Sequence, residues 1–183
     1  LIERKKIITI TNGYDPSDFK NILPVRNNEK FTITFTGNFF SVTSANKFLE
    51  GLSEFLKSNP HAESEILIRF VGSIFDDVSQ RLINSLRLQD VIEVLGYCPY
   101  KKCLQYQADS DVLLLTRSND PGNEVIIPAK LFEYLAVKKP ILALVPRNGE
   151  AARLIRGTKS GIVVSPDDKD EISESILEMY FKF

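Results

Sequence analysis

Short runs of apolar, β-branched residues recur along the chain, separated by polar or turn-forming residues. Several runs are apolar on consecutive positions rather than on every second one, which is typical of strands buried on both faces. We therefore predict strands at residues 6–11, 31–36, 65–71, 91–95, 111–115, 140–145 and 161–164.

Segments with apolar residues at helical spacing lie between these runs. They cover residues 43–57, 77–88, 100–108, 129–136, 149–155 and 168–181. Strands that alternate with helices of this length favour a parallel sheet with helices on both faces, since each crossover returns over the sheet with the same handedness. The sequence therefore predicts an α/β fold, a Rossmann-like doubly wound parallel sheet forming a single domain over residues 1–183.

Composition and charge exclude some classes of protein. The chain has 183 residues, with Lys+Arg 23 against Asp+Glu 24 and a formal net charge of -1. Binding to a phosphate backbone needs a concentrated positive field, so we expect no nucleic-acid partner. Contents of 43% hydrophobic and 26% charged residues are those of an ordinary globular domain.

The two cysteines, Cys98 and Cys103, are too few for a disulfide framework, and their spacing fits no usual zinc pattern. The single histidine, His61, lies far away in the sequence. We expect no metal site, and we expect structural thiols, because a spacing of five along a helix does not place two side chains on one face. A cytoplasmic setting follows from this cysteine usage.

The sequence is not expected to contain a membrane span or a signal peptide. No apolar run reaches the length that crosses a bilayer, and the start of the chain lacks the apolar stretch and cleavage site of a signal peptide. The charged residues that lead into the first apolar run suggest that the chain is a fragment of a longer protein.

The loops that follow the strands are the places to search for a site. In an open doubly wound sheet, ligands bind beyond the carboxyl ends of the strands, where backbone N–H groups and helix N-termini face anions. Gly37 and Asn38 follow one predicted strand, and Gly96 and Tyr97 follow another. A glycine lets the backbone approach a ligand, and Tyr97 can lie beside a base. Gly37 alone is equally compatible with a tight turn, Tyr97 alone is better explained as a packed ring at a turn, and the three-glycine dinucleotide fingerprint is absent.

The polar, turn-rich loop of residues 119–124 precedes a more informative segment. A helix is expected to open near Pro128, which gives its N-terminus an affinity for anions. Lys130 in the first turn can meet a phosphate, and Glu133, three residues later, lies on the same face, where it can accept hydrogen bonds from ribose hydroxyls. The alternative is a surface pair of opposite charges on an amphipathic helix.

These residues carry a family resemblance. Residues 127–136 and 139–143 resemble the "PxKLFEYLAxGKPIL" segment of group-1 glycosyltransferases of the GT-B fold. Residues 12–15 resemble that family's "NGVD" entry into its C-terminal domain, and residues 95–97 resemble its "GYV" loop. Residues 149–155 and 160–164 match its later pattern, so the likeness covers nearly the whole chain in the right order.

The resemblance implies the C-terminal, nucleotide-sugar-binding domain of a retaining glycosyltransferase, without the N-terminal domain that holds the acceptor. It places Tyr97 at the base, Glu133 on the ribose, and the helix start from Pro128 to Leu131 at the pyrophosphate. It also implies that no metal cofactor is needed, because the helix dipole and cationic side chains stabilise the leaving diphosphate. The expected partners are a nucleotide-sugar donor and the missing domain, through which the enzyme can associate with the inner face of a membrane.

Two features depart from the family pattern. Glu133 matches the second glutamate of the paired-glutamate motif, but the first falls on Val125, with Glu124 one place out of register. The Arg and Lys that many members carry after the first glycine-bearing strand are missing. We therefore expect Lys130 to supply part of that charge.

The resemblance gives a function, sugar transfer from a nucleotide-sugar to an acceptor in polysaccharide or glycolipid synthesis, and predicts that the isolated chain is inactive. Two alternatives remain. One is a non-catalytic Rossmann-like nucleotide-binding or regulatory domain, although the acidic pocket and partner lysine of a flavodoxin-like receiver are not evident. The other is a nucleotide-sugar epimerase of GT-B architecture, which needs more histidines than this chain has.

Overall fold

The computed structural model describes residues 8, 10–25, 29–37, 42–72 and 77–182. Six parallel strands form one sheet in the order β3-β2-β1-β4-β5-β6. This order is that of a Rossmann fold, in which the chain reverses its direction of progress between β1 and β4. The strands are β1 (Phe31–Thr36), β2 (Ile66–Val71), β3 (Ile92–Val94), β4 (Val112–Thr116), β5 (Ile141–Leu144) and β6 (Gly161–Val164).

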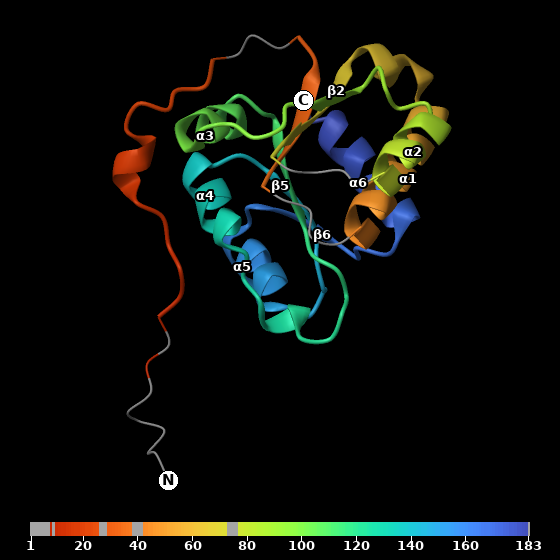
Figure 1. Ribbon diagram of the computed structural model, residues 1–183. Helices are drawn as coiled ribbons and strands as arrows, with labels where there is room; N and C mark the ends of the chain where they lie inside the picture. Colours follow the sequence, from red (N-terminus) through yellow and green to blue (C-terminus); the bar gives the residue numbers. More distant parts are fainter. Residues whose placement is uncertain (1–7, 9, 26–28, 38–41, 73–76, 183) are drawn as a thin grey trace.

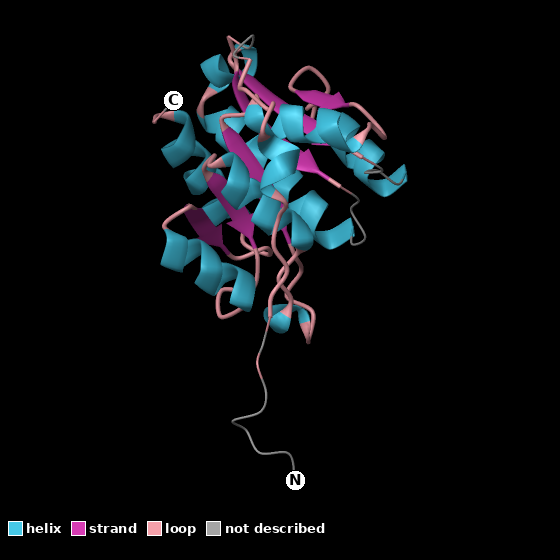
Figure 2. Cartoon of the chain, turned by 90° about the vertical axis from the view of Figure 1, so that its left-hand side faces the viewer, coloured by secondary structure: helices cyan, strands magenta, loops and turns pink. Residues whose placement is uncertain are grey.

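The helices form two layers on the faces of this sheet (Figure 1). The first layer contains α1 (Val42–Ser58), α2 (Asp77–Ser85) and α6 (Lys169–Tyr180), and α1 packs against both of the others. The second layer contains α3 (Tyr100–Ala108), α4 (Ala129–Val137) and α5 (Glu150–Thr158). Figure 2 shows the same layers from the side. Short 3-10 helices are η2 (Pro16–Phe19), η3 (Pro60–Ser64) and η4 (Asn123–Val125).

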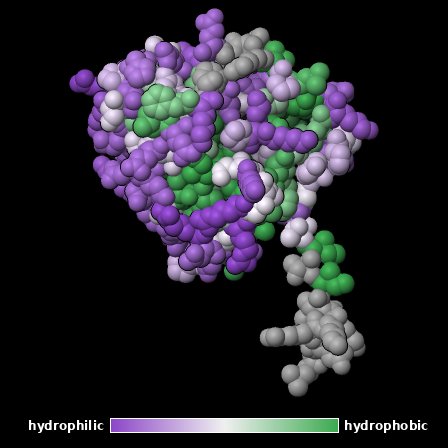
Figure 3. Space-filling view, turned by 180° about the vertical axis from the view of Figure 1, so that it is seen from behind, coloured by the Kyte–Doolittle hydropathy of each residue, from purple (hydrophilic) through white to green (hydrophobic). Residues whose placement is uncertain are grey.

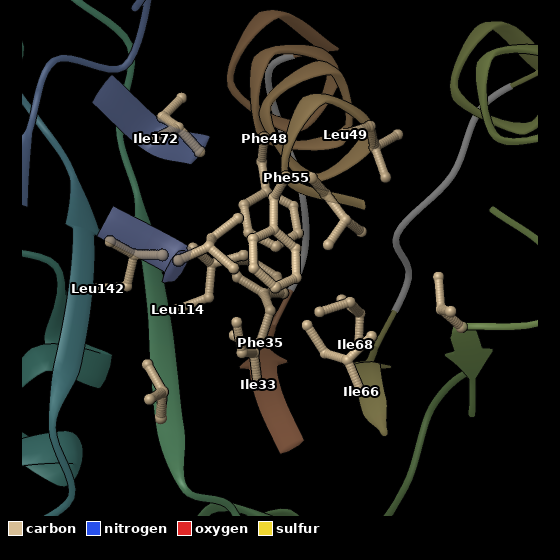
Figure 4. Packing of buried hydrophobic residues seen from close by; sticks show 14 of the residues in the cluster. Ile33, Phe35, Phe48, Leu49, Phe55, Ile66, Ile68, Leu114, Leu142 and Ile172 are labelled. Atoms are coloured by element: carbon tan, nitrogen blue, oxygen red, sulfur yellow. The ribbon is translucent and has the colours of Figure 1, made fainter. Parts of the chain in front are cut away.

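Each face of the sheet has its own hydrophobic cluster. The larger one joins α1 and α6 to the strands, and Figure 4 shows Phe48 and Phe55 of α1 pointing toward Phe35 of β1. The smaller one packs α4 and α5 against the opposite side chains of β4 and β5. Successive residues of β4 alternate between the clusters, since Leu114 belongs to the first and Leu113 to the second. The consecutive apolar residues of the sequence therefore do mark strands that are buried on both faces.

Strand β1 differs from its neighbours because one of its faces is polar. Phe31, Ile33 and Phe35 enter the larger cluster, whereas the hydroxyl groups of Thr34 and Thr36 are buried on the side of α3 and α4. The Thr34 hydroxyl lies 2.6 Å from the Ser110 hydroxyl. This polar strip runs along β1 to its carboxyl end, where the candidate site lies.

The predicted elements agree with the structure apart from one strand. The α/β fold and the single parallel sheet are confirmed, and Asp168 caps the last helix by accepting a hydrogen bond from the Glu171 N–H at 3.0 Å. The strand predicted at residues 6–11 is wrong for the part that the structure describes. Ile8 and Ile10 are 83% and 89% exposed and lie outside any strand, in a segment that leads away from the body of the molecule (Figure 3). An apolar β-branched run becomes a strand only where another strand pairs with it.

Candidate nucleotide-binding site

Glycines end three adjacent strands at one edge of the sheet. Gly37 follows β1, Gly72 follows β2 and Gly96 lies two residues after β3, with φ angles of 115°, 125° and 63°. Their backbones are joined in a row, because the Gly37 N–H donates to the Val71 carbonyl at 2.8 Å and the Gly72 N–H donates to the Gly96 carbonyl at 2.7 Å. A Cβ atom on Gly72 would lie 2.2 Å from the Gly37 carbonyl oxygen, so only glycine fits there. At these three positions the backbone at the strand ends therefore carries no side chain of its own.

Lys130 extends from the first turn of α4 to this row of glycines. Its ammonium lies over the ring of Phe35, 3.9 Å from the centroid. A Cβ on Gly37 would be 2.7 Å from the same nitrogen, so the glycine makes room for the lysine. Pro128 precedes the helix as its N-cap, in extended conformation. The structure thus brings together the glycine turn of β1, Lys130 and the N-terminus of α4.

The charge of Lys130 is partly desolvated. Its pKa is lowered to about 8, chiefly by burial; the carboxylate of Glu133 opposes this effect, and the positive charge of Arg117 adds to it. Arg117 comes directly after β4, on the other side of the point where the sheet reverses its order. Its Nε donates to Asn123 Oδ1 at 2.9 Å, which ties it to the loop that precedes α4. Lys130 and Arg117 are therefore two positive charges close to the N-terminus of α4.

Glu133 is held by a buried glutamine. The side-chain nitrogen of Gln107, a residue 1% exposed, donates to Glu133 Oε2 at 3.1 Å and to the Thr36 hydroxyl at 3.0 Å. Since an ionised carboxylate can only accept, the amide nitrogen must be the atom that faces it. The Gln107 oxygen is buried without a hydrogen-bond partner among the described residues. Such an orphaned acceptor costs free energy, which indicates that the amide is oriented for its two donor contacts.

Tyr134 joins α4 to the end of β1 and to β4 from the buried side. Its hydroxyl accepts a hydrogen bond from the Thr36 N–H at 3.2 Å and lies 3.3 Å from both the Thr36 hydroxyl and the Leu114 carbonyl oxygen. Burial raises the Tyr134 pKa to about 12, so the phenol stays neutral. Glu133 and Tyr134 are neighbours on α4, so this network fixes the helix against the end of β1.

The carboxylates of Glu133 and Asp18 act on Tyr100, the first residue of α3. Burial, followed by the carboxylates of Glu133 and Asp18, raises the Tyr100 pKa to about 12. Asp18 belongs to η2, whose segment lies along α3: the Val25 N–H donates to Asp109 Oδ1 at 2.7 Å. Residues of α3, α4 and η2, which are separate in the sequence, therefore lie close together around Tyr100.

The remaining predicted site residues are placed as follows. Tyr97 is 88% exposed beside Gly96, with its ring available to a ligand. Leu131 is fully buried in the smaller cluster and its N–H already donates to the Pro128 carbonyl at 3.0 Å, so its side chain is a core residue rather than a ligand contact. Asn38 lies outside the described residues.

The structure also describes Val125 and Glu124, the residues at and beside the position of the first motif glutamate. Val125 presents an apolar side chain that is 69% exposed. The Glu124 carboxylate turns back on its own loop, where it accepts a hydrogen bond from the Gly122 N–H at 2.8 Å. Neither residue supplies a free carboxylate in this arrangement.

Three residues at this edge were missed from the sequence. Gly72 follows its strand as Gly37 does, and Arg117 follows a buried strand, so both had the same positional signal. Gln107 had none, because a polar residue on a helix predicts exposure.

The prediction that the side chains of Cys98 and Cys103 do not share a face is wrong. Cys98 lies before α3 rather than within it, and its sulfur is 2.8 Å from that of Cys103.

Two features were not found among the described residues. No three of their histidine, cysteine, aspartate or glutamate side chains are grouped as metal ligands. Within the same part of the chain, no helix combines the length and apolarity that a membrane span requires.

A cavity of about 900 Å³ lies at the opposite edge of the sheet. Its lining includes Phe31, Val112 and Gly161, the first residues of three strands. It is therefore separate from the row of glycines.

The strand order, with its reversal between β1 and β4, defines a Rossmann-like α/β type of domain. Comparison with known families gives the particular one: the family model "Glycosyl transferases group 1" matches residues 19–180. The chain belongs to this family. A Salmonella typhimurium protein, WcaL, named as a colanic acid biosynthesis glycosyltransferase, is 31% identical over 98 residues, which cover 53% of this chain and 24% of that protein.

Solved structures share the fold over nearly the whole chain. WaaG, a glycosyltransferase involved in lipopolysaccharide biosynthesis, matches with a TM-score of 0.75 and 16% identity over 98% of this chain and 48% of its own. Staphylococcus aureus TarM, solved with UDP, matches with a TM-score of 0.71 and 13% identity over 98% of this chain and 34% of its own. The C-terminal domain of Francisella tularensis LpcC has a TM-score of 0.65 and 17% identity, over 93% of this chain and 89% of that domain.

Proposed function

We propose that this chain is the donor-binding domain of a retaining glycosyltransferase and that it binds a nucleotide-sugar at the row of glycines. The observation that carries the proposal is the position of the Lys130 ammonium, against Gly37 and over Phe35 at the reversal point of the sheet. A diphosphate can approach the open backbone there and face both the N-terminus of α4 and the cation.

The role of the site is electrostatic. Breaking the bond between sugar and diphosphate develops positive charge on the sugar and negative charge on the leaving phosphate. Lys130 and Arg117 would stabilise that negative charge, which a metal ion would otherwise do. Arg117 thus supplies a cation that the sequence pattern was missing. We propose that no metal takes part.

The other contacts follow from the same placement. Glu133, held through one of its oxygens by Gln107, keeps acceptor capacity for the two hydroxyls of a ribose. Tyr97 and the backbone around Gly96 would lie beside the base. His61 gives no support to an epimerase, because it lies in η3, directly before the amino end of β2, at the edge opposite the glycines.

Acceptor binding and transfer need a second domain. The chain spans 24% of the length of WcaL, 48% of WaaG and 34% of TarM, so the activity of the whole enzyme extends beyond these residues. We propose that this chain alone binds the donor but transfers no sugar. Sugar turnover by the purified chain would contradict this.

Polysaccharide or glycolipid assembly is the proposed use, supported by the colanic acid and lipopolysaccharide roles in the names of WcaL and WaaG. We place the reaction in the cytoplasm, with any contact to the inner face of the membrane made by the second domain.

Calorimetric titration of the folded chain with UDP-, GDP- and ADP-linked sugars tests the proposal. We expect one class of nucleotide to bind, and Lys130→Ala to weaken it roughly 10- to 100-fold through the loss of a charge-assisted contact. Lys57→Ala, at the far end of α1, is the matched control and should bind as the wild type does. Absence of binding to every nucleotide-sugar would favour the non-catalytic alternative.

A further inference from the structure

Cys98 and Cys103 form a pair of thiols next to the proposed base-binding loop. Their sulfur atoms are 2.8 Å apart, and neither sulfur is in a disulfide. Bonded sulfurs lie at about 2.05 Å, so only a small side-chain rotation separates the pair from a covalent bond. Both residues are half-buried, which leaves the sulfurs within reach of a small reagent.

The local fold explains why residues five apart meet. The chain turns at Pro99, the N-cap of α3, whose carbonyl accepts hydrogen bonds from the N–H groups of Lys102 at 2.9 Å and Cys103 at 3.0 Å. This turn places Cys98 back over the first turn of the helix. The Cys103 sulfur also lies 3.5 Å from the Cys98 carbonyl oxygen, so the contact involves backbone as well as side chain.

The two thiols influence one another. Burial, followed by the nearness of the Cys98 sulfur and the charge of Glu133, raises the Cys103 pKa to about 12. Because the thiolate is the nucleophile, whichever sulfur is deprotonated first starts the reaction and the other completes it.

We propose that Cys98 and Cys103 are a reversible oxidation site that forms an intramolecular disulfide by exchange with a low-molecular-weight disulfide. The thiolate of one cysteine attacks one sulfur of the reagent, and the first reagent thiolate leaves. The other cysteine then gives up its proton and attacks the protein sulfur of this mixed disulfide, which expels the second reagent thiolate. Two protein thiols are oxidised, one reagent disulfide is reduced to two thiols, and the two protons pass to those thiols.

The second step is intramolecular. Once one cysteine is in a mixed disulfide, the sulfur of the other lies beside it. The nearness of the sulfurs then favours ring closure over a lasting adduct.

The disulfide would tie the end of the β3 loop to α3. Gly96 and Tyr97 directly precede Cys98, and the Gly96 carbonyl is bonded to Gly72 in the row of glycines. Oxidation therefore fixes a segment at the candidate site. The reaction itself does not depend on nucleotide binding.

Oxidised glutathione is the probe. After incubation of the folded chain, we expect the count of free thiols to fall from two to none with no glutathione retained, and dithiothreitol to restore both. Trypsin cuts after Lys101 and Lys102, which lie between the cysteines, so only the disulfide joins the two resulting peptides. Detection of that linked pair by mass spectrometry identifies the bond without any variant.

Two variants test whether both sulfurs are needed. Cys103→Ser and Cys98→Ser should each retain one glutathione on the remaining cysteine, because neither variant can close the ring. Thermal unfolding of each variant checks that it folds. Wild-type protein that keeps both thiols, holds a stable glutathione adduct or forms disulfide-linked dimers would overturn the proposal. None of these readouts depends on a nucleotide, so the outcome is distinct from that of the proposed function.

Discussion

The side-chain nitrogen of Gln107 lies 3.1 Å from Oε2 of Glu133, which joins the buried face of α3 to the carboxylate of α4. The same nitrogen donates to Thr36 at the end of β1. One amide group therefore couples the orientation of Glu133 to the strand that carries Gly37. The orientation of Glu133, which we propose binds the ribose, therefore depends on an almost fully buried residue.

Gln107→Leu should affect ligand recognition more than stability. The substitution removes two hydrogen bonds of roughly 1 kcal/mol each, but it also removes a buried oxygen that has no partner among the described residues, so we expect the free energy of unfolding to change by less than about 1 kcal/mol. The Glu133 carboxylate then loses its fixed orientation. Affinity for a ribonucleotide should fall roughly tenfold, and the preference over the 2′-deoxy nucleotide should shrink.

Calorimetry with both nucleotides and urea unfolding check this result. Gln105→Leu is a control on the same helix, because the Gln105 amide bonds Asp109 and the Leu23 carbonyl rather than Glu133. Equal loss of affinity for the ribo and deoxy forms would show that Gln107 acts on the fold in general and not on Glu133.

Nucleoside-diphosphate affinity should decrease as the pH rises through about 8. The Lys130 pKa is lowered to about 8, chiefly by burial, so the free site loses its ammonium charge there, well below the usual lysine range. Calorimetric titrations between pH 7 and 9.5 measure the effect. In Lys130→Met the same pH step should leave the affinity nearly unchanged, and an identical pH profile in both proteins would contradict the role of Lys130.

The same lysine predicts that the free energy of unfolding increases with pH, whereas the nucleotide affinity decreases. Because its pKa is lower in the folded than in the unfolded chain, the unfolded state binds more protons between about pH 8 and 10.5, and Lys130 therefore contributes stability that increases over this range. Below pH 8 the buried charge costs its full penalty. Lys130→Met should thus be more stable than the wild type at pH 7, with the difference shrinking by pH 10. Lys57→Met should show no such trend, since Lys57 is at the exposed end of α1.

The sequence predicted the sheet and helices well because buried parallel strands and amphipathic helices leave local patterns. Leu113 and Leu114 are apolar in succession because each meets a different layer of helices. Ile8 and Ile10 have the same local pattern without a paired strand, so propensity alone misled the prediction. Cys98 was misplaced for a related reason, since the turn at Pro99, and not the helical period, determines its direction.

The site was predictable only in part. Gly37, Gly96 and Lys130 had positional signals, because glycine at a strand end and lysine near a helix start both suggest anion binding. Gln107 and Tyr134 had none, since their polar groups are buried by contacts that join β1, α3 and α4 across distant parts of the sequence. Long-range pairing of this kind has no local signature.

Alanine at the three glycines should destabilise the chain to different extents. Gly96→Ala has open space and a φ near the left-handed helical value, so it should cost about 1 kcal/mol. Gly37→Ala meets the movable end of Lys130 with a φ of 115°, and should cost roughly 2 kcal/mol. Gly72→Ala would bring its Cβ to 2.2 Å from a backbone oxygen and should cost more than about 3 kcal/mol. Urea unfolding ranks the three, and an equal cost at all positions would contradict the close approach of Gly72 to Gly37.

Tyr134→Phe should destabilise the chain by about 1–3 kcal/mol, because it leaves the buried Thr36 N–H without the hydroxyl that accepts from it. The packing of the ring is unchanged, so the decrease in the free energy of unfolding comes from the hydrogen bonds of the hydroxyl alone. Tyr97→Phe removes the same hydroxyl from a side chain that is 88% exposed, and its effect should stay within about 0.5 kcal/mol. Urea unfolding of both variants gives the comparison. If Tyr134→Phe were as mild as Tyr97→Phe, the Thr36 N–H would have another acceptor, and Tyr134 would not be what holds α4, with Glu133, against the end of β1.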